Sequence, residues 1–290
     1  MTVEVPATVA NLGPGFDCFG LALDWYERIL VEVLADGYHV DVSGESAEEL
    51  PRDESHLIIR SALVGLADLG VEVPGLRLRC RNTIPHGRGL GSSSAAIVGG
   101  LVAAAALAGA EPDRHWLLGH ACAIEGHPDN VAAAIHGGLV LAYESDGIKV
   151  AQPLLHPDVA VAVFIPETRV GTAAARNLLP EVVPHADAAA NSGRAALLLH
   201  ALTAEPDLLL DATRDWLHQS YREPVMPQSY ELVKTLRSKG FAAVISGAGP
   251  TVLVLGRHPD MESLDTVQAR GFRWQRLGIG GAAGAVERGS

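Results

Sequence analysis

The chain of 290 residues is 48% hydrophobic and carries a formal net charge of −12. This length and apolar content predict a large buried core and two domains. Because neutralising nucleic-acid phosphates needs clustered Lys and Arg, the charge excludes a nucleic-acid-binding surface. Only three lysines occur, Lys149, Lys234 and Lys239. Any bound anion is therefore expected to contact arginines or backbone N–H groups.

The first residues, "MTVEVPATVANLG", lack a basic segment followed by an apolar run, so we expect no signal peptide and a cytoplasmic location. Cys18, Cys80 and Cys122 lack the spacing of a zinc site or a disulfide framework, and we expect small buried residues there. The Ala- and Gly-rich stretch 94–110 is close to the roughly 17-residue minimum for a membrane span. Its small residues favour a packed internal helix, so no membrane partner is expected.

The first half of the chain alternates between strand and helix patterns. A two-residue period predicts strands over 28–36, 76–82 and 137–144. Helical patterns occur over 55–70, 112–126 and 129–138. We expect Gly70 to end the first of these helices, Asp129 to cap the third at its N-terminus and Gly137 to end it.

The pattern starts afresh after Pro153. A strand is predicted over 158–166, helices over 172–179, 187–203 and 229–240, and strands over 242–247 and 251–256. This order predicts two mixed α and β units, residues 1–154 and residues 155–290.

Three glycine-rich turns, 11–17, 86–94 and 246–250, could let a ligand approach the backbone. In the second, a strand ends near Arg81 and a helix begins among Ser92, Ser93 and Ser94. Free N–H groups and the positive end of the helix dipole then face the turn, an arrangement that binds phosphate. A simple tight connection capped by serine is the alternative interpretation.

Several phosphate-binding classes are excluded. A Walker A loop requires a Gly-Lys pair, and the nearest lysine is Lys149. Protein-kinase HRD and DFG motifs are absent. The "GIGGAA" at 278–283 matches a dinucleotide-binding fingerprint in letters but lacks the following helix and strand pattern.

Four stretches resemble motifs of the GHMP kinase family. "PHGRGLGSSSA" (85–95) resembles its ATP-binding signature, and "SGAGPTVLVL" (246–255) resembles its third motif. "VPATVANLGPGFDCFGLAL" (5–23) and "EGHPDNVAAAIHGG" (125–138) are similar to the homoserine kinase branch. The resemblance implies an α+β, two-domain fold, with an ATP-binding N-terminal domain like domain 2 of ribosomal protein S5 and a ferredoxin-like C-terminal domain.

The resemblance also implies an activity: transfer of the ATP γ-phosphoryl group to the hydroxyl of L-homoserine, giving O-phospho-L-homoserine for threonine biosynthesis, with Mg²⁺ as cofactor and a homodimer as the assembly. Its ATP-binding residues would be Pro85, His86, Gly87, Arg88, Gly89, Leu90, Gly91, Ser92, Ser93 and Ser94. The third motif would contribute Ser246, Gly247 and Gly249 to the site. Another GHMP-type kinase acting on mevalonate or a sugar, and a non-catalytic nucleotide-binding relative, are the alternatives.

The resemblance assigns Ser93 and Glu125 to Mg²⁺, a hydroxyl and carboxylate set that suits this ion. Glu125 could instead be an exposed carboxylate at a helix end. Asn11, Asn130 and Glu125 match the family's catalytic positions, and its substrate contacts match Asn11, Asp17, His127, Asn130, Thr172, Arg176 and Arg222.

Arg176 and Arg222 match carboxylate-binding arginines, and Arg pairs bidentately with a carboxylate. Thr172, four residues before Arg176, would share its helix face. Without the resemblance, both arginines would be ordinary solvated side chains. Asp17 and His127 would face the substrate ammonium group.

Asn11 and Asn130 would orient the reacting hydroxyl, although Asn11 and Asp17 could equally be turn formers. Mevalonate kinases use an Asp as general base, whereas homoserine kinases carry Asn at the position matching Asn130. We therefore expect direct attack by the hydroxyl, with Asp129 mainly a helix cap. The segment 24–29 departs from the family pattern and receives no role.

Overall fold

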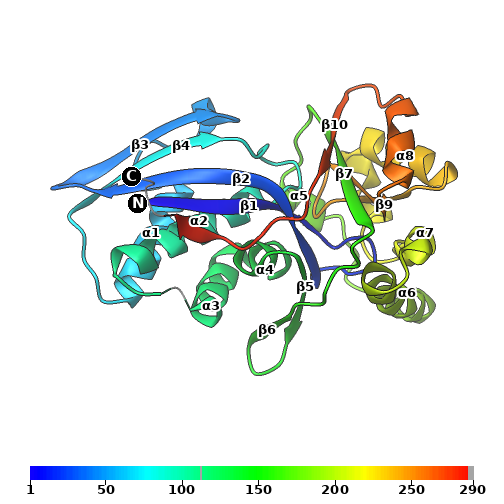
Figure 1. Cartoon of the computed structure of the whole chain (residues 1–290), viewed down its shortest axis with the longest axis horizontal. Helices are drawn as coiled ribbons and strands as arrows, with labels where there is room; N and C mark the ends of the chain where they lie inside the picture. The colour runs from blue at the N-terminus through cyan, green and yellow to red at the C-terminus, as the bar shows by residue number, and fades with distance from the viewer. Residues whose placement is uncertain (112, 287–290) are drawn as a thin grey trace.

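The computed structural model describes residues 1–111 and 113–286, which form two lobes, each built on one β-sheet (Figure 1). The first sheet contains β1 (Thr2–Ala10), β2 (Phe19–Val33), β3 (Gly37–Gly44), β4 (Gly75–Asn82), β5 (Leu139–Glu144), β6 (Ile148–Ala151) and β11 (Gly284–Val286). The second contains β7 (Val159–Pro166), β8 (Ala242–Ile245), β9 (Val252–Arg257) and β10 (Phe272–Leu277).

The first sheet has the order β11-β1-β2-β4-β3, and β5 pairs with the beginning of β2 and with β6. Four helices cover one face of it: α1 (Leu57–Asp68), α2 (Ser92–Leu107), α3 (Arg114–Glu125) and α4 (Asp129–His136) (Figure 1). β3 and β4 are parallel neighbours joined through α1, while the other pairs are antiparallel. A short 3-10 helix, η1 (Ala47–Glu49), follows β3.

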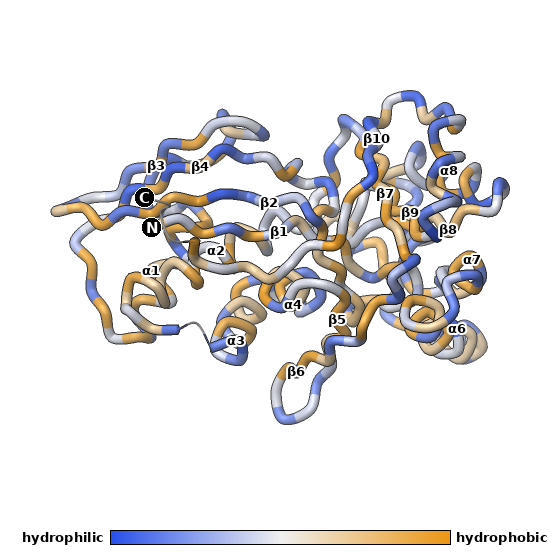
Figure 2. The backbone as a smooth tube through the Cα atoms, in the orientation of Figure 1, coloured by the Kyte–Doolittle hydropathy of each residue, from blue (hydrophilic) through white to orange (hydrophobic). Residues whose placement is uncertain are grey.

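The second sheet has the order β10-β7-β9-β8 with every pair antiparallel, which is the ferredoxin-like arrangement. Its remaining elements are α5 (Thr172–Arg176), α6 (His185–Thr203), η2 (Pro206–Leu208), α7 (Leu209–Ala212), η3 (Ser220–Val225), α8 (Pro227–Ser238) and η4 (Asp260–Thr266). Figure 2 shows many hydrophilic residues in the outer loops around β10 and α8.

Both faces of this second sheet are covered because β7 is apolar at every position. Val161 and Val163 point toward the cluster that includes α6 and α7, whereas Ala162 and Phe164 join the cluster with α8 and η4. Consecutive strand residues point to opposite faces, so this continuous apolar run predicts a strand buried on both sides. The α+β, two-domain fold class is confirmed.

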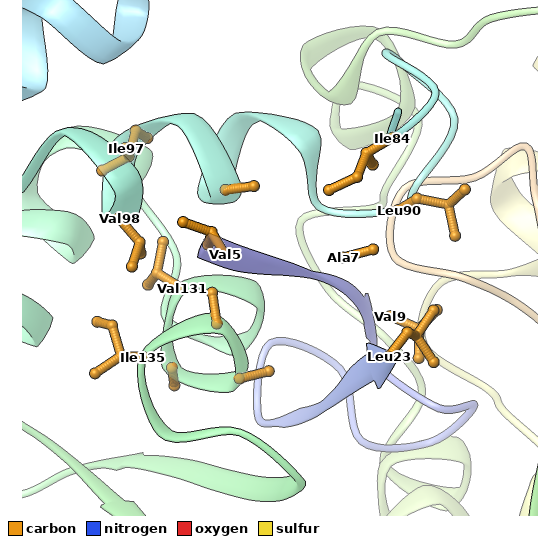
Figure 3. Packing of buried hydrophobic residues seen from close by; sticks show 14 of the residues in the cluster. Val5, Ala7, Val9, Leu23, Ile84, Leu90, Ile97, Val98, Val131 and Ile135 are labelled. Atoms are coloured by element: carbon orange, nitrogen blue, oxygen red, sulfur yellow. The ribbon is translucent and has the colours of Figure 1, made fainter. Parts of the chain in front are cut away.

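The core of the first lobe is built around α2, which is buried on nearly all sides. Figure 3 shows Ile97 and Val98 of α2 beside Val5 of β1, with Val131 and Ile135 of α4 close by. The expectation of a packed internal helix is confirmed, and no helix of the described chain is long and apolar enough to cross a bilayer. The cysteines are free; Cys80 and Cys122 are buried and Cys18 is half-buried.

Each helix and strand expected from the sequence is present, and most ends are shifted by a few residues. The strand expected over 28–36 is only the second part of β2, which begins at Phe19, and the helix expected over 172–179 ends at Arg176. The cap assignment at 129 is wrong: Pro128 occupies the cap position and Asp129 is the first helical residue. No expectation covered the strands β1, β3 and β10 or the short strands β6 and β11, and Pro6 and a bulge interrupt the pattern of β1.

β11 pairs antiparallel with β1, so the last described residues lie on the first sheet (Figure 1). The domain boundary near residue 155 stays a prediction. That boundary assigns residues 284–286 to the second unit, whereas β11 lies in the first sheet.

Gly100 sits where α1 and α2 pack against each other. A Cβ there would lie 2.4 Å from the backbone oxygen of Ile58 and 2.9 Å from the nitrogen of Ala62. Backbone atoms of a packed helix cannot move aside cheaply. We expect Gly100→Ala to lower the free energy of unfolding by about 1–3 kcal/mol through overpacking.

The matched control is Gly119→Ala in α3, where an added Cβ meets nothing within 4 Å. That change should raise stability by roughly 0.5–1 kcal/mol, because alanine loses less backbone entropy in a helix. Urea unfolding of both variants measures the difference. Equal stabilisation of the two variants would show that the helices separate easily at this contact.

Candidate active site

A cavity of about 180 Å³ lies where the three glycine-rich turns meet. It draws residues from both lobes, and every side chain expected from the sequence to bind substrate or metal lines it. Its lining is Asn11, Asp17, Gly87, Gly89, Gly91, Ser92, Ser93, Glu125, His127, Asp129, Asn130, Val170, Gly171, Thr172, Arg176, Arg222, Gly247, Ala248 and Gly249. Of the third motif, Ser246 is buried outside this lining.

The turn before α2 approaches its neighbours so closely that glycine is required. A Cβ on Gly89 would lie 2.2 Å from the backbone oxygen of Ser246, and one on Gly91 would lie 1.9 Å from Thr8 Oγ1. Both glycines also have left-handed φ angles of 70° and 69°. The turn therefore leads straight into the N-terminus of α2 and leaves its first N–H groups facing the cavity, which favours an anion there.

Only part of the expected ATP-binding stretch faces this cavity. Leu90 is buried and points into the core, anchoring the turn (Figure 3). Arg88 turns away: its Nε donates to Pro166 O at 2.8 Å and its Nη2 to Glu167 O at 2.8 Å. This side chain ties the turn to the second sheet. Pro85, His86 and Ser94 also lie outside the cavity lining.

A second hollow of about 420 Å³ adjoins the cavity and shares Gly87, Ser92 and Ser93 with it. We call it the apolar pocket; much of its wall consists of Leu50, Pro51, Leu57, Ile58, Ile84, Ala95 and Ala96. Sequence reasoning did not find it, because its wall combines residues of the loop before α1 with the first turn of α2. Its place beside the phosphate-type turn suits a flat apolar ring.

Ser93 and Glu125 lie together, as the metal assignment requires. Ser93 Oγ donates to Glu125 Oε1 at 2.7 Å, and Ser94 Oγ donates to the same oxygen at 3.1 Å. Within the described residues no group of three or more His, Cys, Asp or Glu side chains is arranged to hold a metal. One carboxylate and one hydroxyl fit Mg²⁺, which completes its shell with phosphate oxygens and water.

Asp129 organises the neighbouring wall. Its Oδ1 accepts hydrogen bonds from Asn130 N at 2.7 Å and Asn130 Nδ2 at 3.3 Å, and lies 3.0 Å from His127 Nδ1. Thr8 Oγ1 donates to Asn130 Oδ1 at 2.8 Å. Asp129 is therefore a buried residue of the cavity wall, whereas we expected it from the sequence to act mainly as a helix cap.

These contacts set the charge of His127. Burial lowers its pKa, but the hydrogen bond and charge of Asp129, together with the charge of Glu125, outweigh burial and raise the pKa above the usual value. The ring is consequently protonated over a wider pH range than an exposed histidine.

The opposite wall carries an ion pair between the two lobes. Arg176 Nη1 donates to Asp17 Oδ2 at 3.0 Å and Nη2 to Oδ1 at 2.7 Å, a bidentate arrangement. Arg222 is almost fully buried nearby, and burial followed by the charge of Arg176 lowers its pKa to about 10. The ring of Phe16 lies within 5.6 Å of the Arg176 guanidinium and 5.5 Å of that of Arg222.

Asn11 holds two turns together. Its Nδ2 donates to Gly247 O at 3.0 Å, and its Oδ1 accepts from Asp17 N at 2.9 Å. Asn11 and Asp17 have φ angles of 69° and 54°. They are thus turn residues as well as cavity residues, since Asn and Asp tolerate this conformation best after glycine.

Both halves of the chain match a known family. The GHMP kinases N terminal domain matches residues 56–138, and the GHMP kinases C terminal domain matches residues 188–269. The homoserine kinase of Streptomyces coelicolor is 53% identical, over 96% of this chain and 91% of that protein. The chain belongs to the homoserine kinase branch of the GHMP kinase family.

Solved structures of this branch share the fold. The homoserine kinase of Cytophaga hutchinsonii is 27% identical with a TM-score of 0.87, covering 96% of this chain and 94% of that one. The putative homoserine kinase of Listeria monocytogenes is 32% identical with a TM-score of 0.80, covering 99% of both. The site described above is thus set in a homoserine kinase fold.

The raised pKa of His127 can be measured by NMR titration of its ring. We expect a midpoint above the usual value of about 6.5 in the unliganded protein. Asp129→Asn should lower this midpoint, because the negative charge that raises the pKa against the effect of burial is then removed. The exposed Asp146→Asn is the control and should leave the midpoint unchanged.

The corresponding stabilisation has a defined pH window. Because the folded-state pKa is raised, protonated His127 stabilises the fold fully below about pH 6.5, and this is lost as the pH rises through the folded-state pKa. A wild-type midpoint below that of an exposed histidine would contradict the assigned contacts.

Proposed function

We propose that this homoserine kinase family member transfers the γ-phosphoryl group of ATP to the side-chain hydroxyl of L-homoserine. The observation that carries the proposal is the Asp17–Arg176 ion pair, placed in the same cavity as the phosphate-type turn. Phosphoryl transfer depends on positioning and charge neutralisation, and the cavity supplies both kinds of group.

A zwitterionic amino acid is the substrate class that this wall complements. The two arginines repel each other in the free protein, so a carboxylate placed between Arg176 and Arg222 relieves their repulsion. The carboxylate of Asp17 receives the ammonium group. Thr172, at the start of α5, completes this end of the cavity.

ATP occupies the remaining space in this proposal. The triphosphate lies along Gly87–Ser93 at the N-terminus of α2, and the adenine enters the apolar pocket that shares these residues. Ser93 and Glu125 hold Mg²⁺, which when bound neutralises phosphate charge. The main contribution of the chain itself is backbone N–H groups, which bind phosphate without any lysine.

Asn130 orients the substrate hydroxyl for direct attack. Its Oδ1 accepts a hydrogen bond from Thr8, and its Nδ2 therefore faces the part of the cavity wall formed by Asp129. The hydroxyl oxygen bonds to the γ-phosphorus, the bond to the β–γ bridging oxygen breaks, and ADP leaves. The hydroxyl proton passes to a phosphate oxygen or to solvent, since Asn130 stands at the position that matches the general base of mevalonate kinases, and the Oδ1 of Asp129 is engaged by its own neighbours. A homodimer is a further proposal from the resemblance, and the cytoplasmic location expected above stays a proposal as well.

The direct test is ADP release with ATP and Mg²⁺, measured for L-homoserine, L-serine, mevalonate and galactose. We expect a clear preference for L-homoserine over mevalonate and galactose, because only the amino acids offer a carboxylate and an ammonium group together. A preference for mevalonate or galactose would contradict the proposal. Nucleotide binding without turnover of any alcohol would identify a non-catalytic relative.

The mechanism predicts unequal effects at two neighbouring positions. Asn130→Ala should lower kcat by more than tenfold because the hydroxyl loses its orienting group. Asp129→Asn should lower kcat far less than the roughly 100- to 10,000-fold typical of losing a general base. A loss of that size for Asp129→Asn, with kcat of Asn130→Ala unchanged, would show that Asp129 is the base.

A further inference from the structure

His218 lies behind Arg222 and contacts both Arg222 and the first glycine-rich turn. Its side chain is fully buried, just before η3. His218 Nε2 lies 2.8 Å from Gly13 O, and His218 Nδ1 lies 3.2 Å from Arg222 Nη1. One ring thus contacts the arginine and the turn that carries Asp17.

The partners of the ring decide its protonation state. A guanidinium can only donate and a carbonyl can only accept, so Nδ1 must accept from Arg222 and Nε2 must donate to Gly13. The ring is therefore neutral, with its proton on Nε2. Burial, and then the charge of Arg222, hold the pKa of His218 below the usual value.

Asp215 fixes the ring from behind. Its carboxylate accepts from Leu217 N at 2.8 Å and Gln219 N at 2.7 Å, and its Oδ1 lies 3.6 Å from His218 Nε2. A negative charge on this side favours the tautomer with hydrogen on Nε2. Phe16 stacks on the imidazole with ring centroids 5.2 Å apart. The ring is held on each of these sides.

Arg222 depends on this support because it forms no carboxylate ion pair among the described residues. Its Nη1 donates to Gly247 O at 2.9 Å and to His218, while its Nε meets no acceptor in residues 1–111 and 113–286. The guanidinium lines the cavity. Its direction is therefore determined by two acceptors on the same nitrogen and by the Phe16 ring 5.5 Å away, and losing the His218 acceptor removes one of these constraints.

We propose that His218 is a positioning residue that fixes the direction of the Arg222 guanidinium and thereby sets the affinity of the site for the substrate carboxylate. This inference rests on the proposed function, which places that carboxylate between Arg176 and Arg222. It assigns His218 no contact with substrate or nucleotide.

Two variants separate the two contacts of the ring. The amide of asparagine lies close to the position of histidine Nδ1, and the amide of glutamine lies close to that of Nε2. His218→Asn therefore keeps an acceptor for Arg222, whereas His218→Gln keeps only a donor for Gly13. The exposed His258→Gln is the matched control.

The readouts are the KM for L-homoserine, the KM for ATP, and the inhibition constant of 3-aminopropan-1-ol, which is homoserine without its carboxylate. For His218→Gln we expect the KM for L-homoserine to rise about tenfold, the effect of one lost hydrogen bond to a charged group. The KM for ATP and the inhibition constant of 3-aminopropan-1-ol should change less than about twofold, because neither compound places a carboxylate beside Arg222. His218→Asn should stay within about threefold of wild type for all three.

The inference fails if His218→Gln weakens both compounds equally, if it weakens ATP as much as L-homoserine, or if the KM for L-homoserine is unchanged. Arg222→Gln separates it from the proposed function, because that variant should remove the preference for the compound with a carboxylate. If Arg222→Gln keeps the preference, the proposed carboxylate site is wrong. If His218→Gln keeps the preference and Arg222→Gln loses it, the proposed carboxylate site is supported and only the inference about His218 is wrong.

A measurement on the unmodified protein keeps the inference testable if His218→Gln does not fold. NMR of the ¹⁵N-labelled ring should show a neutral imidazole with hydrogen on Nε2 at neutral pH. An imidazolium, or hydrogen on Nδ1, would overturn the inference, since neither form can accept a bond from Arg222.

Discussion

The close approach of three backbone turns is the constraint on which the site depends. The carbonyl of Ser246 lies so near the α-carbon of Gly89 that any larger residue there would collide with it. Gly91 packs in the same way against Thr8 of the first strand. These contacts join the N-terminus of α2 to a turn of the second lobe, so phosphate-type and amino-acid-type walls face a single cavity. The glycines therefore contribute through packing as well as through conformational freedom.

Charge is arranged around this cavity so that each bound group has a partner. Asp17 and Arg176 neutralise each other in the free protein, and Arg222 beside them has no carboxylate partner in the part of the chain that the structure describes. Glu125 sits at the opposite side with two serine hydroxyls. A zwitterion next to a metal-bound triphosphate complements this pattern, whereas a neutral sugar would leave the ion pair closed and the buried arginine without a counter-charge.

Much of the fold follows from local patterns in the sequence. The helix beginning at Ser92 is indicated by its glycine turn and serines, and β7 by an apolar run long enough for one strand. The strand over 2–10 was not predicted because Pro6 and the bulge beside it interrupt the alternation. The return of β11 to the first sheet depends on contacts between distant parts of the chain, which a local pattern does not contain.

The site was predictable to a similar degree. Family motifs indicated Ser93, Glu125, Arg176 and Asp17, and the cavity brings them together. The supporting role of His218 carries only a weak signal, its spacing of four residues before Arg222, and the orientation of Arg88 away from the cavity carries none. Such features depend on which side chains meet after folding, so a linear pattern cannot specify them.

The most direct test of the central claim is a crystal structure with L-homoserine and a non-hydrolysable ATP analogue. The carboxylate is expected between Arg176 and Arg222, the ammonium group at Asp17, and the hydroxyl beside Asn130 and the terminal phosphate. An amino acid bound in the reverse direction, or bound outside the cavity with the Asp17–Arg176 pair still closed, would contradict this account.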